Sequence, residues 1–151
     1  MTVMFCGHAD FRGTAEQEQR LFALLEEVIG AETADLYLGG YGGFDGFAYE
    51  CCKRYRNIHP NVSLVFVTPY MTLEYQRKHL AELQAKFDAI LYPELENKPP
   101  RFAISYRNQY MVEKADYVIA YVDHDWGGAY TTYRYAKRKR KVIFNLAEFD
   151  G

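Results

Sequence analysis

Short apolar runs alternate with longer amphipathic stretches along the whole sequence. Residues 62–67 (Val-Ser-Leu-Val-Phe-Val) are apolar at every position but one, which is typical of a parallel strand buried on both faces. Thr14 is placed to cap a helix that runs to Ile29, and Gly30 follows as a stop signal. By the same reasoning we expect strands over residues 2–6, 35–38, 62–67, 117–122 and 142–146, and helices over residues 14–29, 44–57, 73–87, 102–114 and 128–139.

This order of elements predicts the α/β fold class, in which helices cover both faces of a parallel sheet and the crossovers are right-handed. A chain of 151 residues is the size of one domain. We therefore expect a single Rossmann-like domain over residues 1–151, with three α/β/α layers and a mainly parallel sheet of about five strands. Ligands of such folds bind at the carboxyl ends of the strands.

The composition limits the kinds of binding partner that the sequence predicts. The net charge of −2 gives no overall attraction to nucleic acid or to a membrane. Three cysteines, Cys6, Cys51 and Cys52, form no disulfide framework and indicate reduced thiols. No apolar run approaches the ~18 residues of a membrane span. We expect a soluble, cytoplasmic protein with no membrane partner, and its 14 tyrosines are compatible with a homo-oligomer.

Five glycines occur within residues 39–46, between an apolar run and a predicted helix. Glycines at a strand-to-helix junction let backbone N–H groups approach a ligand, and the helix that follows points its positive end into the same space. The spacing matches neither a Walker loop nor a dinucleotide-binding motif. Asp45 lies in the first helical turn, where it either caps the helix or accepts hydrogen bonds from a ribose. The ligand-binding residues expected from this loop are Gly39, Gly40, Gly42, Gly43 and Asp45.

A second junction of this kind begins at Gly127. Free N–H groups over residues 128–130, with a hydroxyl from Thr131 or Thr132, would form a phosphate cradle. The alternative is an ordinary helix start capped by Asp125. The expected ligand-binding residues here are Gly127, Gly128, Ala129 and Thr131.

Two further polar clusters belong to the same expected site. Gly7, His8 and Arg12 follow the first strand, where the histidine and arginine could meet an anion. Arg107 offers a planar fork for phosphate or carboxylate, and Asn108 beside it offers both a donor and an acceptor. Because every cluster falls at the carboxyl end of a strand or on the helix before the last buried strand, one shared site is expected.

Other chemistries are not favoured by the sequence. His8, His124 and three nearby aspartates have no diagnostic metal-ligand spacing, so no metal is expected. The basic run over residues 137–141 ends a helix, where cations complement the helix dipole, and a solvated helix end is favoured over a nucleic-acid patch. No nucleophile is visibly paired with a base, so the sequence does not decide whether the protein is an enzyme.

At these residues the chain resembles the SMF/DprA–LOG (SLOG) superfamily of Rossmann-like domains, and within it the small stand-alone YpsA-like branch, which includes phage and Firmicutes proteins of unknown function. The resemblance covers nearly the whole chain and implies a nucleotide-type ligand held by the glycine loops, with no other cofactor required. Its matching residues are Cys6-Gly7-His8, Phe11-Arg12, residues 39–45, Tyr70, residues 107–112 and residues 126–129.

Two groups of relatives imply different functions. LOG enzymes release a base from nucleoside monophosphates with a Pro-Gly-Gly-x-Gly-Thr-x-x-Glu motif, but Gly43 and Gly46 stand here where its Thr and Glu would be. DprA-like proteins bind single-stranded DNA, and residues 43–45 and 107–108 resemble two of their elements. The function we expect is binding, or sensing, of a nucleotide or nucleotide-derived ligand. The alternatives are LOG-like N-glycosidic bond cleavage, with Asp45 or Glu50 stabilising an oxocarbenium-like centre, and DprA-like DNA binding.

Overall fold

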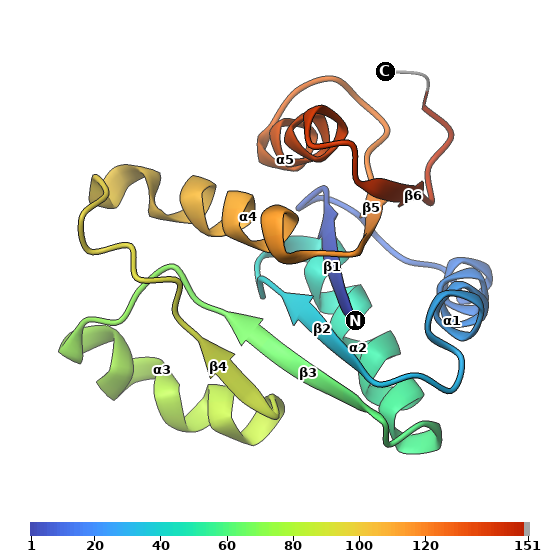
Figure 1. The fold of residues 1–151 in the computed structure, drawn as a ribbon, viewed down its shortest axis with the longest axis horizontal. Helices are drawn as coiled ribbons and strands as arrows, with labels where there is room; N and C mark the ends of the chain where they lie inside the picture. The colour runs from blue at the N-terminus through green and yellow to red at the C-terminus, as the bar shows by residue number, and fades with distance from the viewer. Residues whose placement is uncertain (150–151) are drawn as a thin grey trace.

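The structure, a computed structural model, describes residues 1–149. Within this range the chain forms one sheet whose strands all pair in parallel, in the order β4-β3-β2-β1-β5-β6 (Figure 1). The strands are β1 Thr2–Gly7, β2 Ala34–Leu38, β3 Val62–Val67, β4 Ala89–Leu91, β5 Tyr117–Tyr121 and β6 Val142–Asn145. The helices are α1 Ala15–Ile29, α2 Gly42–Ile58, α3 Leu73–Lys86, α4 Ala103–Lys114 and α5 Gly128–Arg138, with a short 3-10 turn η1 at Pro100–Phe102.

The α/β class and the parallel sheet are confirmed, but the expected strand number is wrong: the described part of the chain has six strands rather than about five. The missed strand is β4, which has only three residues and pairs with Val65–Val67 of β3 at the sheet edge. None of its residues is fully buried. A segment of three residues is too short to show the alternation of apolar and polar residues that predicts a strand. Its extended conformation depends on pairing with β3.

Two separate cores lie on the two faces of the sheet. Along β1, Val3 and Phe5 face the core beneath α1 and α2, whereas Met4 and Cys6 face the core beneath α4 and α5. Figure 1 shows α4 and α5 on the opposite side of the sheet from α1 and α2. This alternation explains why the inner strands are apolar at nearly every position. No helix of residues 1–149 is long and apolar enough to cross a membrane.

Helix α1 begins where the sequence predicts, directly after Thr14. The Thr14 hydroxyl accepts a hydrogen bond from the Gln17 N–H, and the Gln17 side chain accepts one from the Thr14 N–H, which completes a capping box. Gly30 ends the helix, as expected.

Strand β1 lies between β2, which follows it in the sequence, and β5, which pairs with its other edge. The strand order therefore reverses between β1 and β5, which is where folds of this class bind ligands.

Candidate functional site

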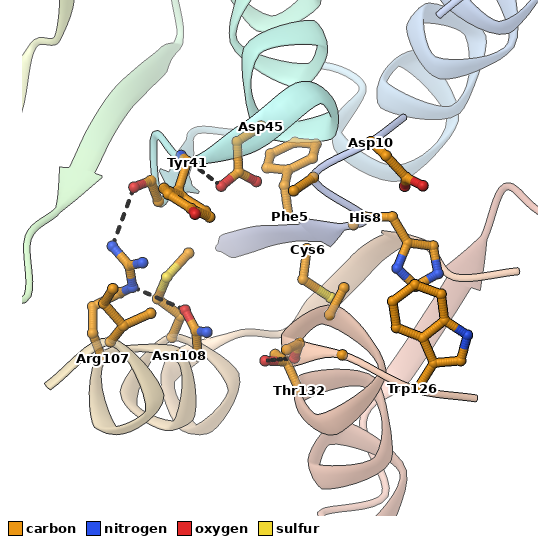
Figure 2. Close-up of a pocket in the computed structure, with 18 of the residues that line it drawn as sticks. Phe5, Cys6, His8, Asp10, Tyr41, Asp45, Arg107, Asn108, Trp126 and Thr132 are labelled. Carbon is orange, nitrogen blue, oxygen red and sulfur yellow. Dashed lines mark hydrogen bonds between the residues drawn. The ribbon is translucent and has the colours of Figure 1, made fainter. Parts of the chain in front are cut away.

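Loops that are far apart in the sequence meet around a cavity of ≈ 370 Å³ at the carboxyl ends of β1 and β2 (Figure 2). Figure 2 shows Arg107 and Asn108 of α4 on one side, His8 and Trp126 on the other, Asp45 above and Thr132 of α5 below. A volume of this size lies within the ~300–1,000 Å³ of small-molecule sites. The expected site residues that line it are Gly7, His8, Gly39, Asp45, Arg107, Asn108, Gly127, Gly128 and Ala129.

The other expected site residues lie outside this cavity. Gly40 and Gly42 line a second cavity of ≈ 360 Å³ against α3, and Asp45 borders both cavities. Thr131 is exposed, and the neighbouring Thr132 lines the first cavity instead. Neither cavity is lined by Arg12, Gly43 or Tyr70.

The glycine loop between β2 and α2 packs directly against the loop after β1. The Gly43 N–H donates to the Ala9 carbonyl at 2.8 Å, and the Phe44 N–H donates to the His8 carbonyl at 3.3 Å. A Cβ at Gly43 would lie 2.1 Å from the Phe11 carbonyl oxygen. Glycine is therefore required here for close packing, and the N–H groups of Gly43 and Phe44 are already bound within the chain.

Asp45 caps its own helix. One carboxylate oxygen accepts a hydrogen bond from the Tyr41 N–H at 2.9 Å, and the residue is 9% exposed. Burial raises the pKa of Asp45 to about 6, although the Tyr41 hydrogen bond and the charge of Arg107 act in the opposite direction. The capping expected as one of two roles is thus present, and a ribose contact stays a prediction.

Arg107 ties α4 to the ends of two strands. Its Nη1 donates to the carbonyls of Val67 at 2.7 Å and Gly39 at 3.2 Å, and its Nε donates to the Asn108 side-chain oxygen at 2.9 Å. The residue is 3% exposed, and burial lowers the pKa of its guanidinium. Its Nη2 makes no hydrogen bond to any residue in the range 1–149 and lies on the cavity side in Figure 2. Those N–H groups are therefore available to a ligand.

Three aromatic rings stack at the other end of the cavity. The rings of His8 and His124 lie 3.5 Å apart and those of His124 and Trp126 3.9 Å apart, all nearly parallel. His8 Nε2 accepts the Asp123 N–H at 3.1 Å, which places the proton of the neutral ring on Nδ1. Burial and the neighbouring His124 both lower the pKa of His8, so the neutral ring is favoured. Trp126 ends the stack with 64% of its surface exposed.

The side chains of His8, His124 and Asp123 have the composition of a metal site, because one ring nitrogen of each histidine and a carboxylate oxygen of Asp123 lie within 4.8 Å of one another. Their geometry does not suit one. The two rings are parallel to within 12°, so their in-plane lone pairs do not converge on a point. In addition, His8 Nε2 is already occupied by a backbone N–H.

The N-terminus of α5 is open. Gly127 precedes it with φ 91°, which favours glycine, and no side chain caps it, so Asp125 does not play the capping role considered above. Within residues 1–149 the N–H groups of Gly128, Ala129 and Tyr130 have no acceptor. A Cβ at Gly128 would meet nothing within 4 Å. Of these three residues, Gly128 and Ala129 line the cavity.

Sequence patterns did not reveal several cavity residues. Trp126 entered the sequence analysis only through the resemblance over residues 126–129, and nothing in the sequence places the ring of His124 between Trp126 and His8. The only signal was the position of Trp126 directly before the second glycine pair. The cavity residues outside the expected ligand-binding set are Phe5, Cys6, Ala9, Asp10, Tyr41, Ile104, Met111, His124, Trp126 and Thr132.

Comparisons with known proteins bear on the fold. No protein-family model matches the chain, and no curated protein matches its sequence. Among solved structures, the chain is similar to DNA processing protein A from Helicobacter pylori, described for its single-stranded DNA binding mode, with TM-score 0.65 and 21% identity over 100% of this chain. It is also similar to DNA processing protein A from Streptococcus pneumoniae, with TM-score 0.62 and 13% identity over 95% of this chain.

The chain spans 67% and 49% of the lengths of these two proteins. At such low identity the similarity shows a shared Rossmann-like fold and does not transfer an activity.

Proposed function

We propose that this protein binds a nucleotide or nucleotide-derived ligand in the cavity at the carboxyl ends of its strands. It would then serve as a small sensing domain of the SLOG type, in its YpsA-like branch. The observation that carries the proposal is that an open helix N-terminus and an exposed aromatic stack face the same cavity, with Trp126 immediately before the Gly127 cap. A phosphate and a base joined through one sugar need two such subsites close together.

The phosphate subsite is formed by the start of α5. Three unpaired N–H groups there coincide with the positive end of the helix dipole, which favours an anion. Across the cavity, the free Nη2 of Arg107 supplies a charged donor. The carbonyl contacts of Nη1 hold this guanidinium in place before a ligand arrives, which lowers the entropic cost of binding.

The base subsite is the outer face of Trp126. Because two imidazole rings support the indole from behind, its position is fixed before a base stacks on it. Stacking of a base on an aromatic side chain contributes about 1–3 kcal/mol and tolerates any base. The carboxylates of Asp10 and Asp45 on the same cavity are acceptors for sugar hydroxyls.

The test is a thermal-shift panel of mono-, di- and cyclic nucleotides, followed by calorimetric titration of any ligand that shifts the midpoint. At ~100 times its dissociation constant, a ligand adds roughly 2.7 kcal/mol to stability. For a domain of this size we expect a midpoint increase of roughly 5–10 °C. Absence of a shift with every nucleotide would contradict the proposal.

Two variants locate the ligand. Gly128→Asp places a carboxylate among the free N–H groups of α5 and should abolish binding without loss of folding, since the added side chain meets no neighbour. Trp126→Ala should weaken binding by roughly 5- to 150-fold, the equivalent of one stacked base. Leu73→Ala, an equally exposed apolar residue on α3, is the matched control and should bind as the wild type does. A folded Gly128→Asp protein with normal affinity would exclude α5 from the site.

An enzymatic alternative rests on Asp45, the buried carboxyl that borders the cavity. At neutral pH a group with a pKa of about 6 is mostly ionised and could stabilise a positive sugar centre during N-glycosidic bond cleavage. Glu50, the other carboxyl considered for this role, is exposed and lines neither cavity. Cys6 lines the cavity, but burial raises the pKa of its thiol to about 12, so it is no nucleophile at neutral pH. Base release from nucleoside monophosphates that Asp45→Asn abolishes would favour this alternative over sensing.

DNA binding in the cavity is the remaining alternative, and its support is the similarity of fold to a protein described for binding single-stranded DNA. An oligonucleotide that raises the midpoint of the wild type but not that of Gly128→Asp would favour this alternative. Cytoplasmic localisation and assembly into a homo-oligomer stay predictions, to be tested by fractionation and by light scattering.

A further inference from the structure

Positive charge is concentrated in one short segment of the chain. Residues 134–141 hold six of the 18 Lys and Arg residues, and no Asp or Glu occurs from 127 to 147. The remainder of the sequence therefore has 12 cations against 20 acids, a formal charge of −8, whereas this segment alone has +6. The small net charge of the whole protein hides this asymmetry.

The structure places these cations along the exposed side of α5 and just beyond its end. Figure 1 shows α5 as an outer helix beside β6. Thr132, Tyr133 and Ala136 form its buried side, Arg134 and Arg138 lie on the opposite side, and Lys139 and Arg140 follow the helix end. The exposed cations are Arg134, Lys137, Arg138, Lys139 and Arg140, which we name the α5 basic face.

Tyrosines are interleaved with these cations. Arg134 lies over the ring of Tyr130 at 5.7 Å, and Arg138 and Lys139 lie over the ring of Tyr135 at 5.5 and 5.4 Å. Such cation–π contacts hold flexible side chains against the helix while leaving the charge in solvent. Within residues 1–149, Arg134, Arg138, Lys139 and Arg140 form no salt bridge. Their mutual repulsion is therefore not compensated by acidic neighbours.

The sequence alone favoured a solvated helix end, but the extent of the basic face exceeds what the helix dipole explains. Dipole stabilisation falls off within the last turn of a helix. Arg134 lies about a turn before the end of α5 at Arg138, and Arg140 lies beyond it. Within α5 the cations extend from Arg134 to Arg138, about 6 Å along the helix axis, and Lys139 and Arg140 continue beyond its end. A row of cations that extends on both sides of the helix end suits a polyanion with several phosphates better than a single helix terminus does.

We propose that the α5 basic face binds the phosphodiester backbone of a nucleic acid, independently of base sequence. A flat helix side rich in Arg, Lys and Tyr supplies phosphate contacts and offers no groove for reading base edges. A membrane surface is less suited, because the apolar side of α5 is buried against the sheet and cannot insert into lipid. The face lies toward the carboxyl end of α5, while the proposed nucleotide cavity is at its amino end, so the two sites are distinct.

The experiment is fluorescence anisotropy of the full chain with labelled single-stranded DNA, single-stranded RNA of the same sequence, and duplex DNA. With three to four phosphate contacts on a duplex, affinity should fall roughly 40- to 150-fold between about 50 and 200 mM salt. The three nucleic acids distinguish a single-stranded from a duplex target. Similar affinities for scrambled sequences are expected.

The decisive variant is Arg134→Gln/Arg138→Gln/Lys139→Gln, and its matched control is Lys53→Gln/Arg77→Gln/Lys78→Gln, which removes the same charge from exposed positions on α2 and α3. We expect the first variant to lose at least ~10-fold in affinity and to show a shallower salt dependence, and the control to bind as the wild type does. Equal losses in both variants would overturn the proposal. It would also be overturned if no oligonucleotide bound at low salt, if only anionic vesicles bound, or if Gly128→Asp abolished oligonucleotide binding that the first variant retained.

Discussion

Replacing Asp45 with a neutral side chain should change how the free energy of unfolding depends on pH. The burial of Asp45 determines the direction of that change. Asp45 lies in the first turn of α2, close enough to feel the charge of Arg107, and 9% of its surface is exposed. Its pKa is raised from 3.8 to about 6. Below pH 3.8 the carboxyl is protonated in both folded and unfolded chains. As the pH rises from there to about 6, the unfolded chain releases this proton while the folded chain keeps it, so the folded state loses stability.

The size of the loss follows from the two pKa values. Their difference is 6 − 3.8 = 2.2, which corresponds to about 3 kcal/mol at 1.36 kcal/mol for each pKa unit. Asp45→Asn removes this titration and retains an oxygen that can accept the Tyr41 N–H. Any change in stability that does not involve proton binding at position 45 is the same at every pH. The free energy of unfolding of the variant should therefore rise relative to that of the wild type by about 2 kcal/mol between pH 4 and pH 8.

Urea unfolding of both proteins at several pH values measures this difference directly. Asp10→Asn is the matched control, because it neutralises an exposed carboxyl on the same cavity, which water solvates in folded and unfolded chains alike. Its stability relative to the wild type should stay nearly constant. If the Asp45→Asn difference is flat, or falls with rising pH, burial does not dominate the electrostatics of this carboxyl and the argument fails.

Other substitutions test how the cavity walls are built. Gly43→Ala should lower the free energy of unfolding by roughly 2 kcal/mol or more, because its methyl group would overlap the Phe11 carbonyl. Gly46→Ala in the same helix meets nothing and should raise it by up to about 1 kcal/mol; equal effects in urea titrations would refute the packing role of Gly43. Arg107→Lys cannot reproduce both carbonyl contacts and should cost about 2–3 kcal/mol, with a weaker nucleotide affinity by calorimetry; unchanged stability would show that these contacts are not needed.

The sequence predicted most of the fold because its long elements have strong local signals. The capping box at Thr14 and the apolar run 62–67 determine their structures almost without help from the rest of the chain. β4 could not be found in this way, since its three residues are held extended by β3. The ring stack was missed for a similar reason: His8 and Trp126 are distant in sequence, and only the pairing of β1 with β5 brings their loops together.

Two glycine-rich helix starts in one protein serve different purposes, and the difference lies in whether their N–H groups are already bound. At α2 the donors of Gly43 and Phe44 are bound by carbonyls of the loop after β1, and a glycine is needed because the two backbones touch. At α5 the donors of residues 128–130 have no partner among residues 1–149, and the space before them is open. Both loops look alike in sequence, but only the second retains donors for an anion. A glycine-rich strand-to-helix junction therefore predicts phosphate binding only where no neighbouring loop supplies carbonyls to the same N–H groups.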